Sequence, residues 1–265
     1  MLAFLKRLLW ITSVHGLDPL RAAAAIRGVP AYLRDLRELR RQERRAKEPF
    51  GPRVLFPFLF DRYQQSGTAM GQYFHHDLWV AQRIFLNRPQ RHVDVGSRID
   101  GFVAHVAAFR EIEVFDVRPL AVAVPNIKFR QVDLMKDIPP ELSDYCDSLS
   151  CLSALEHFGL GRYGDPLNYD GHVLGLKSMR QVLRQGGKFY LAVPIGPQRL
   201  EFNAHRVFSL THLLRLVEHD FRMDQFCYVD DKGALHADVK LTAAAIETSI
   251  GCRYGAAILE MTKLP

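Results

Sequence analysis

The sequence predicts an α/β protein in which a seven-stranded, mostly parallel sheet with helices on both faces follows an N-terminal helical extension. Two features support this class. From residue 91 onward, short runs of β-branched and aromatic residues alternate with stretches of helical periodicity, which is typical of βαβ units. Before residue 50, leucines and alanines recur at helical spacing between charged residues, which indicates helices without strands.

Composition and charge narrow the functional classes. The 265 residues are 48% hydrophobic and 24% charged, as in an ordinary globular protein. The formal charge of +6 is compatible with an acidic substrate, nucleic acid or an anionic membrane, and much of the excess lies in the arginine-rich segment 34–45. Acidic residues interrupt that segment and no set of stacking aromatic residues accompanies it, so nucleic acid is disfavoured. The four cysteines lack zinc-type spacing and are interpreted as reduced and structural.

Breaker residues divide the chain into three parts. Residues 1–50 are expected to form the helical extension. Residues 51–90 are expected to form a cap of loops and one helix, His76 to Leu86, which leads into the core. Residues 91–265 are expected to form the α/β domain.

Periodicity places the elements of this domain in order. The predicted strands are His92 to Val95, Ile112 to Phe115, Ile127 to Arg130, Tyr145 to Cys151, Lys188 to Val193, Phe221 to Val229 and Ala256 to Thr262. The clearest helices between them are Phe102 to Phe109, His172 to Leu183 and Leu210 to His219.

A glycine turn follows the first predicted strand. Asp94, Gly96, Ser97 and Gly101 lie where the strand ends and a helix begins, which is the place where an open Rossmann-like sheet binds a nucleotide-like ligand. The exposed backbone amides of the helix N-terminus suit a carboxylate at this point. These four residues are therefore candidate cofactor ligands, although the glycines alone would also permit a tight turn without a ligand.

Two further acids and one arginine refine the cofactor class. Asp116 ends the second strand, about 20 residues on, where a carboxylate can accept hydrogen bonds from ribose hydroxyls. Asp133 follows the third strand, where it can meet an adenine amino group. Arg98 occupies the position where a dinucleotide fingerprint has its second glycine and would crowd a pyrophosphate. S-adenosylmethionine has no phosphate and fits the turn better.

At this point the segment from Arg91 to Leu264 resembles class I S-adenosylmethionine-dependent methyltransferases. The resemblance rests on the Asp-x-Gly turn, Asp116, Asp133, the segment Ser153-Ala154-Leu155-Glu156-His157 after the fourth strand, and Leu183-Arg184-Gln185-Gly186-Gly187 before the fifth. It implies a Rossmann-like fold with S-adenosylmethionine as cofactor. The usual turn is closer to Asp-x-Gly-x-Gly-x-Gly; here Arg98 replaces the central glycine and Gly101 lies one position later.

A narrower resemblance covers the second half of the chain. The segments Glu156 to Pro166, Val193 to Gly196 and Phe202 to Phe208 are similar to an uncharacterised family numbered 268 among domains of unknown function. That family has no established reaction, so the similarity implies fold and site position. The resemblance to the methyltransferases also places Tyr73 to Asp77 over the cofactor, with His76 near a substrate.

Methyl transfer from a sulfonium needs an aligned nucleophile and, for an oxygen nucleophile, a base. His157, at the carboxyl end of the fourth strand, is the first candidate, followed by Asp165 and His205. The candidate substrate-binding residues are His76, Glu156, Arg162, Tyr163, Asn203 and Arg206. Two alternatives stay open: Glu156 and Arg162 could pair to hold the loop, and His205 could cap or pack against the next helix.

Three expectations concern metals and membranes. The adjacent His75 and His76 point in different directions without a third ligand, so no metal is expected. No run reaches the roughly 18 apolar residues of a membrane span, because Lys6 and Arg7 interrupt the one candidate, and the expected location is cytoplasmic. The apolar stripe that begins at Leu2 could touch the cytosolic membrane face, but packing on the domain or on a second subunit is favoured.

The leading hypothesis is therefore a methyltransferase acting on a small molecule or a sugar or glycan precursor, by O-methylation. A catalytically inactive, methyltransferase-like scaffold is the first alternative, since Arg98 alters the glycine turn. An oxidoreductase that uses a dinucleotide is the second, and the same arginine disfavours it. The sequence defines neither the methyl acceptor nor the oligomeric state.

Overall fold

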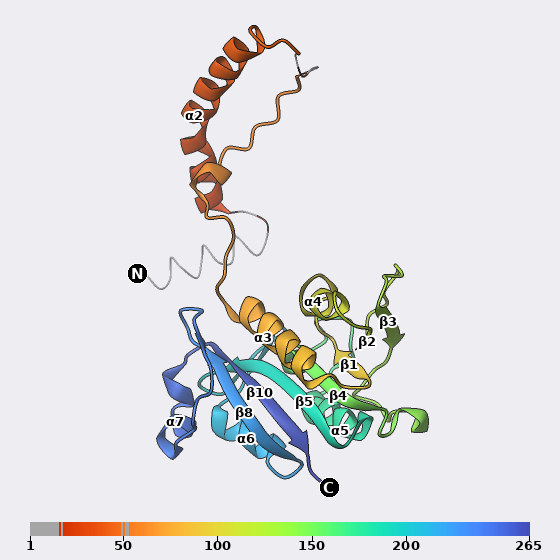
Figure 1. The fold of residues 1–265 in the computed structure, drawn as a ribbon. Coiled ribbons are helices and arrows are strands. Elements are labelled where there is room, and N and C mark those ends of the chain that lie inside the picture. The colour runs from red at the N-terminus through yellow and green to blue at the C-terminus, as the bar shows by residue number, and fades with distance from the viewer. Residues whose placement is uncertain (1–15, 17, 49, 51–52) are drawn as a thin grey trace. The chain divides into compact units, whose positions relative to one another are not determined.

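A computed structural model describes residues 16, 18–48, 50 and 53–265 of the chain (Figure 1). The chain divides into two compact units, residues 1–68 and 69–265. The expected helix at residues 2–10 and its apolar stripe lie outside the described residues. The second unit includes the helix that the sequence assigns to a cap before the α/β domain.

The first unit is built on α2 (Pro19–Glu43), where a helix was expected. The side chain of Asp18 caps its N-terminus by accepting hydrogen bonds from the amides of Leu20 and Arg21, at 3.1 and 3.0 Å. Gly28 is the buried residue of this helix, and a Cβ there would lie 1.7 Å from the carbonyl oxygen of Leu59. Only glycine allows so close a passage of the returning chain. That returning segment includes the short 3-10 helix η1 (Asp61–Tyr63).

The second unit contains the predicted sheet. Its strands are β1 (His92–Val95), β2 (Ile112–Asp116), β3 (Ile127–Gln131), β4 (Cys146–Leu152), β5 (Leu183–Ile195), β8 (Phe221–Val229), β9 (Leu235–His236) and β10 (Gly255–Lys263). Their order is β3-β2-β1-β4-β5-β10-β8-β9. The five strands from β3 to β5 are mutually parallel, and β10 runs antiparallel between β5 and β8.

All seven predicted strands are confirmed, but the sheet has eight. The added strand is β9, whose two residues pair with the end of β8 through Tyr228–His236 and Val229–Leu235. A strand this short gives no alternation of apolar and polar residues, which is why the sequence does not reveal it. A separate two-stranded hairpin, β6 (Arg199–Glu201) and β7 (His205–Val207), was also missed.

Helices cover both faces of the sheet, as expected. On one face, α3 (Gln72–Asn87) and the turns η2 (Ile99–Val103) and α4 (Ala104–Ala107) share one core cluster. On the other, α5 (Gly171–Val182) and α6 (Leu210–Val217) share a second. The remaining short helices are η3 (Pro140–Leu142), η4 (Leu155–His157), α7 (Ala243–Glu247) and η5 (Ser249–Gly251).

Neighbouring residues of β10 pack in the core clusters on opposite faces of the sheet. Ile258 is fully buried in the cluster under α3, whereas Leu259 is fully buried in the cluster under α5 and α6. Successive side chains of a strand point to opposite faces, so one apolar run supplies two cores.

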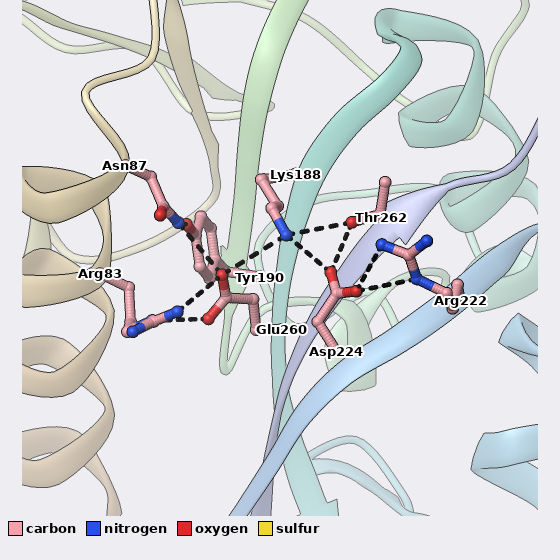
Figure 2. A network of polar contacts seen from close by, with 8 residues as sticks. All are labelled: Arg83, Asn87, Lys188, Tyr190, Arg222, Asp224, Glu260 and Thr262. Carbon is pink, nitrogen blue, oxygen red and sulfur yellow. Dashed lines mark hydrogen bonds and ion pairs between the residues drawn. The ribbon is translucent and has the colours of Figure 1, made fainter.

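Helix α3 is fixed to the sheet by a polar network near its C-terminus (Figure 2). Glu260 of β10 accepts hydrogen bonds from Arg83 Nε at 2.6 Å and from Asn87 Nδ2 at 3.1 Å. Asn87 also donates to the hydroxyl of Tyr190 on β5 at 2.6 Å. The N-terminal part of α3, which carries His76, lies at the carboxyl ends of the parallel strands. Of the helices in the described residues, none is long and apolar enough to cross a membrane.

Candidate cofactor and acceptor site

A cavity lies at the carboxyl ends of the parallel strands, with an empty volume of about 910 Å³ including its open mouth. Its walls come from α3, from the turns after β1 to β4, and from the loop that follows η4. The lining residues are Tyr73, His76, Asp77, Val95 to Arg98, Phe115 to Arg118, Val132 to Met135, Leu152 to Ala154, His157, Phe158, Tyr163 and Asp165. This edge is where open α/β sheets bind their ligands.

Gly96 begins the turn at the base of the cavity. Its φ is +70°, and a Cβ there would lie 2.9 Å from the Cβ of Ala154. Its amide donates a 2.9 Å hydrogen bond to the carbonyl of Phe115. Glycine is therefore required both by the left-handed backbone and by the close approach of the segment after β4. Gly96 and Ser97 line the cavity, as predicted for cofactor ligands.

Asp94 does not line the cavity, contrary to the prediction that it contacts the cofactor. It is fully buried and accepts hydrogen bonds from the Ser97 amide and hydroxyl, at 3.0 and 2.8 Å, and from the Ser150 hydroxyl at 2.6 Å. Burial raises the pKa of this carboxyl to about 7, against the effect of those hydrogen bonds. Asp94 thus stabilises the turn through its hydrogen bonds with Ser97 and ties it to Ser150 of β4.

Gly101, also a predicted cofactor ligand, is likewise absent from the lining. It lies in η2 with φ −122° and ψ −112°, and a Cβ there would be 2.8 Å from Asp77 Oδ2. The missing side chain makes room for a carboxylate that does line the cavity.

Arg98 leaves the cavity open. Its side chain is 65% exposed, and its guanidinium donates to both carboxylate oxygens of Asp100, at 3.1 and 2.8 Å. The residue that departs from the usual glycine pattern therefore points to solvent.

The two predicted acids after β2 and β3 both line the cavity. Asp116 is held by Arg118, whose amide and Nε lie 2.8 and 3.0 Å from Oδ1 and whose Nη2 lies 2.6 Å from Oδ2. Asp133 Oδ1 accepts the amide of Met135 at 3.0 Å. Each carboxylate has lone pairs beyond these contacts, so each can accept a hydrogen bond from a ligand.

His157 lines the cavity from η4. Its Nδ1 is 2.6 Å from the carbonyl oxygen of Ala204, which can only accept, so Nδ1 carries the proton and Nε2 of the neutral ring has a free lone pair. Burial lowers the pKa of His157 to about 4, so the ring is neutral at neutral pH. The ring of Tyr163, also in the lining, meets it edge-on with centroids 5.3 Å apart.

Asp165 lines the cavity, but its carboxylate serves the loop before it. Oδ2 accepts the amides of Gly159 and Gly161 at 2.8 and 3.3 Å, and Oδ1 accepts the amide of Tyr163 at 3.2 Å. With three backbone donors, Asp165 holds the loop that carries Tyr163, and its catalytic role stays a prediction.

Arg206, predicted to clamp a substrate, holds the backbone. It is buried and donates to the carbonyls of Glu156, Phe158 and Tyr169, at 3.4, 2.6 and 2.8 Å. These three hydrogen bonds tie the guanidinium to both ends of the loop, and a contact of Arg206 with a substrate stays a prediction.

Three further predicted residues, Arg162 and Asn203 for substrate binding and His205 for catalysis, are absent from the lining. Arg162 is exposed and donates to the Ala204 carbonyl at 3.2 Å rather than to Glu156, the partner considered as an alternative. Asn203 is exposed, in the turn between β6 and β7. His205 is half-buried on β7, with Nε2 3.3 Å from Glu201 Oε2, and its ring lies 6.2 Å from that of His157.

Glu156 is the most unusual of this group. It is 2% exposed, its Oε2 has no hydrogen-bond partner among the described residues, and its Oε1 is 3.8 Å from His157 Nε2. Burial raises the pKa of this carboxyl to about 8, so it holds a proton at neutral pH.

Ser153 and Asp77 line the cavity although neither is among the predicted site residues. Ser153, with φ +53°, follows β4, and its hydroxyl lies 3.1 Å from Nε2 of His76. Asp77 follows His76 in α3, and its Oδ1 lies 2.9 Å from His76 Nδ1. The signal for both was present, since Ser153 opens the segment that supports the resemblance and Asp77 adjoins a predicted substrate residue. Their meeting depends on how α3 packs, which the sequence does not give.

The chain has the fold of class I S-adenosylmethionine-dependent methyltransferases. The cyclase SpnF is 16% identical and aligns over 72% of this chain and 81% of its own, with a TM-score of 0.51, which shows the fold alone. Two further solved structures are also similar. The YcgJ protein of Bacillus subtilis is 16% identical and aligns over 72% of this chain and 99% of its own, with a TM-score of 0.49. The N-methyltransferase NodS of Bradyrhizobium japonicum, in complex with S-adenosylhomocysteine, is 10% identical and aligns over 73% of this chain and 88% of its own, with a TM-score of 0.48.

The particular family is given by the second half of the chain. Residues 127–258 match the profile described as "Caenorhabditis protein of unknown function, DUF268", and the chain belongs to this family. No curated protein matches the sequence significantly.

Proposed function

We propose that this protein is an S-adenosylmethionine-dependent methyltransferase. The observation that supports it most is the open cavity at the carboxyl edge of the sheet, where Gly96, Asp116 and Asp133 from three successive strand ends line one hollow. Ligand sites of open α/β sheets lie at this edge, in cavities lined mainly by apolar groups with a few convergent polar ones.

The lining suits the parts of this cofactor in order along the edge. Gly96 and Ser97 offer backbone and hydroxyl groups to its amino-acid tail. Asp116 offers a carboxylate to the two ribose hydroxyls, and Asp133 one to the adenine amino group. When bound, the cofactor supplies a methyl group that is already activated on a sulfonium.

The acceptor side is best explained by His157. Its Nε2 carries a lone pair and lies in the lining, so it orients an acceptor hydroxyl and takes its proton. Alignment is the larger contribution because the lowered pKa makes His157 a weak base. We propose O-methylation of a small molecule or a sugar or glycan precursor, because neutral hydroxyl groups match the uncharged His157.

The scaffold alternative rested on Arg98. Since that side chain is solvent-exposed and paired with Asp100, the altered turn gives no reason to exclude a cofactor. The dinucleotide alternative is disfavoured because Arg98 occupies the position where the fingerprint has the glycine that lets a pyrophosphate approach the backbone.

Calorimetric titration tests the proposal. The protein should bind S-adenosylmethionine and S-adenosylhomocysteine with micromolar affinity and bind NADH far more weakly. Transfer of a radiolabelled methyl group to a panel of sugar and phenol acceptors then tests the reaction. If folded protein binds neither S-adenosyl compound, the proposal fails.

A further inference from the structure

We propose that Asp77 is the anionic subsite of the cavity that recognises the positive charge of the cofactor, and that Gly101 is glycine in order to leave room for its carboxylate. This inference rests on the proposed function and adds a residue from α3, outside the glycine turn, to cofactor recognition.

The first observation is the isolation of a buried charge. Asp77 is 8% exposed and lines the cavity. Among the described residues, the group within ion-pair distance is Nδ1 of His76 at 2.9 Å, which is charged only when protonated. The nearby Arg98 pairs with Asp100 instead. A buried carboxylate without a permanent cationic partner is unfavourable, so a cation in the cavity would relieve that cost.

The second observation comes from the neighbouring turn. A Cβ on Gly101 would lie 2.8 Å from Asp77 Oδ2, closer than a real Cβ contact. The carboxylate therefore occupies the space that any other residue at position 101 would fill. This contact explains why the later glycine of the turn matters although it does not line the cavity.

The third observation is the place of the charge. Ser97 and Arg98 of the glycine turn line the same cavity as Asp77, and the negative charge of Asp77 adds to the burial that raises the pKa of Asp94. The Asp77 carboxylate thus lies at the glycine turn, where the amino-acid end of the cofactor would lie. S-adenosylmethionine carries two cationic groups there, the sulfonium and the α-ammonium. Adenosine carries neither.

The experiment compares three ligands on five proteins: wild type, three single variants and the double variant of Asp77 and Gly101. The variants are Asp77→Asn, Gly101→Ala and, as matched control, Asp100→Asn, which removes an exposed carboxylate that pairs only with Arg98. Each is titrated calorimetrically with S-adenosylmethionine, S-adenosylhomocysteine and adenosine, after thermal unfolding has shown that it is folded.

Asp77→Asn should lower the affinity for S-adenosylmethionine by about 10- to 100-fold, the effect of losing one hydrogen bond between charged groups. Adenosine affinity should stay within about twofold, as should every affinity of Asp100→Asn. An equal loss for S-adenosylhomocysteine would assign Asp77 to the ammonium, and a loss confined to S-adenosylmethionine would assign it to the sulfonium. Both results support the proposal.

Gly101→Ala should resemble Asp77→Asn, and the double variant should lose little more than either, because both changes remove one interaction. If wild-type protein binds S-adenosylmethionine and Asp77→Asn binds it equally well, this inference is overturned while the proposed function stands. If Asp77→Asn loses as much affinity for adenosine as for S-adenosylmethionine, the inference is also overturned, since that result indicates a merely structural role. Absence of binding to wild-type protein would overturn both.

Discussion

Glu260 on β10 and Glu156 after β4 are equally buried, at 1% and 2% exposure, but their carboxyl groups have opposite surroundings. Both oxygens of Glu260 are used: Arg83 donates to each, at 2.6 and 3.3 Å, and Asn87 donates to one at 3.1 Å (Figure 2). Glu156 leaves Oε2 without a partner among the described residues. One carboxyl is saturated and the other is not.

The difference separates structure from function within one sheet. A buried polar group that is fully paired contributes a defined geometry, and here the Glu260 network fixes α3. A buried polar group that lacks a partner costs stability and persists where a ligand or a reaction uses it. Glu156, with an unpartnered Oε2 among the described residues, and Asp77, which has His76 as its ion-pair partner, lie near the carboxyl ends of the parallel strands, whereas the saturated network joins the C-terminal part of α3 to β5 and β10.

The largest expected effect is on stability at the saturated network. Glu260→Ala leaves Arg83 and Asn87 without their acceptor and should lower the free energy of unfolding by about 3 kcal/mol, toward the low end for a broken buried pair because Arg83 is one-third exposed. Urea unfolding measures it. S-adenosylhomocysteine affinity of the folded variant should change by less than about threefold. A variant as stable as wild type would remove the structural role of the network.

The reverse pattern is expected at the carboxyl edge. Asp116→Asn should lower the affinity for S-adenosylhomocysteine by about tenfold or more, because a neutral amide replaces the carboxylate that accepts hydrogen bonds from the ribose hydroxyls. Its stability should fall by less than about 1 kcal/mol, since Arg118, its partner, is largely exposed. Calorimetry and urea unfolding on the same samples give both numbers. Unchanged affinity together with a large loss of stability would reverse the comparison.

The pH dependence of stability tests the unsaturated carboxyl. Glu156 keeps its proton in the folded state up to a pKa of about 8, whereas the unfolded chain loses it above its ordinary value of 4.5. The folded state therefore binds more protons between these values, so this group makes wild-type stability fall as pH rises, by up to about 1.4 kcal/mol per pH unit.

Glu156→Gln removes that slope and leaves the other titrating groups in place. Between pH 5 and pH 8 the variant should gain stability relative to wild type. Unfolding free energies at several pH values check the trend. A difference that is constant with pH would mean that Glu156 is ionised in the folded protein.

The smallest expected effect is the absence of a titration. Because burial lowers the pKa of His157 to about 4, its ring should stay neutral from pH 5.5 to pH 8. The ring proton resonance, assigned by comparison with His157→Gln, should therefore not move over that range in NMR spectra. A midpoint inside the range would show that the ring is partly charged near neutral pH and would contradict the uncharged His157 of this account.

Local pattern explains what the sequence could predict. The seven strands repeat apolar residues every second position or run apolar throughout. Gly96 marks the turn after the first strand, where the backbone has a φ of +70° that favours glycine. The internal partners of Asp94 and Arg206 could not be predicted, because the sequence gives the type of a residue but not which partners its atoms already have. The sequence placed the segment that ends at Asp77 over the cofactor, but not the contact of Asp77 with Gly101, which the packing of α3 creates.

The central claim is that the carboxyl-edge cavity holds S-adenosylmethionine. Crystals grown with S-adenosylhomocysteine test it most directly. We predict ligand density along the turn from Gly96 to Arg98, with ribose hydroxyls within hydrogen-bond distance of the Asp116 carboxylate. An empty cavity at a ligand concentration that saturates the protein in solution, or density at another place, would contradict the account.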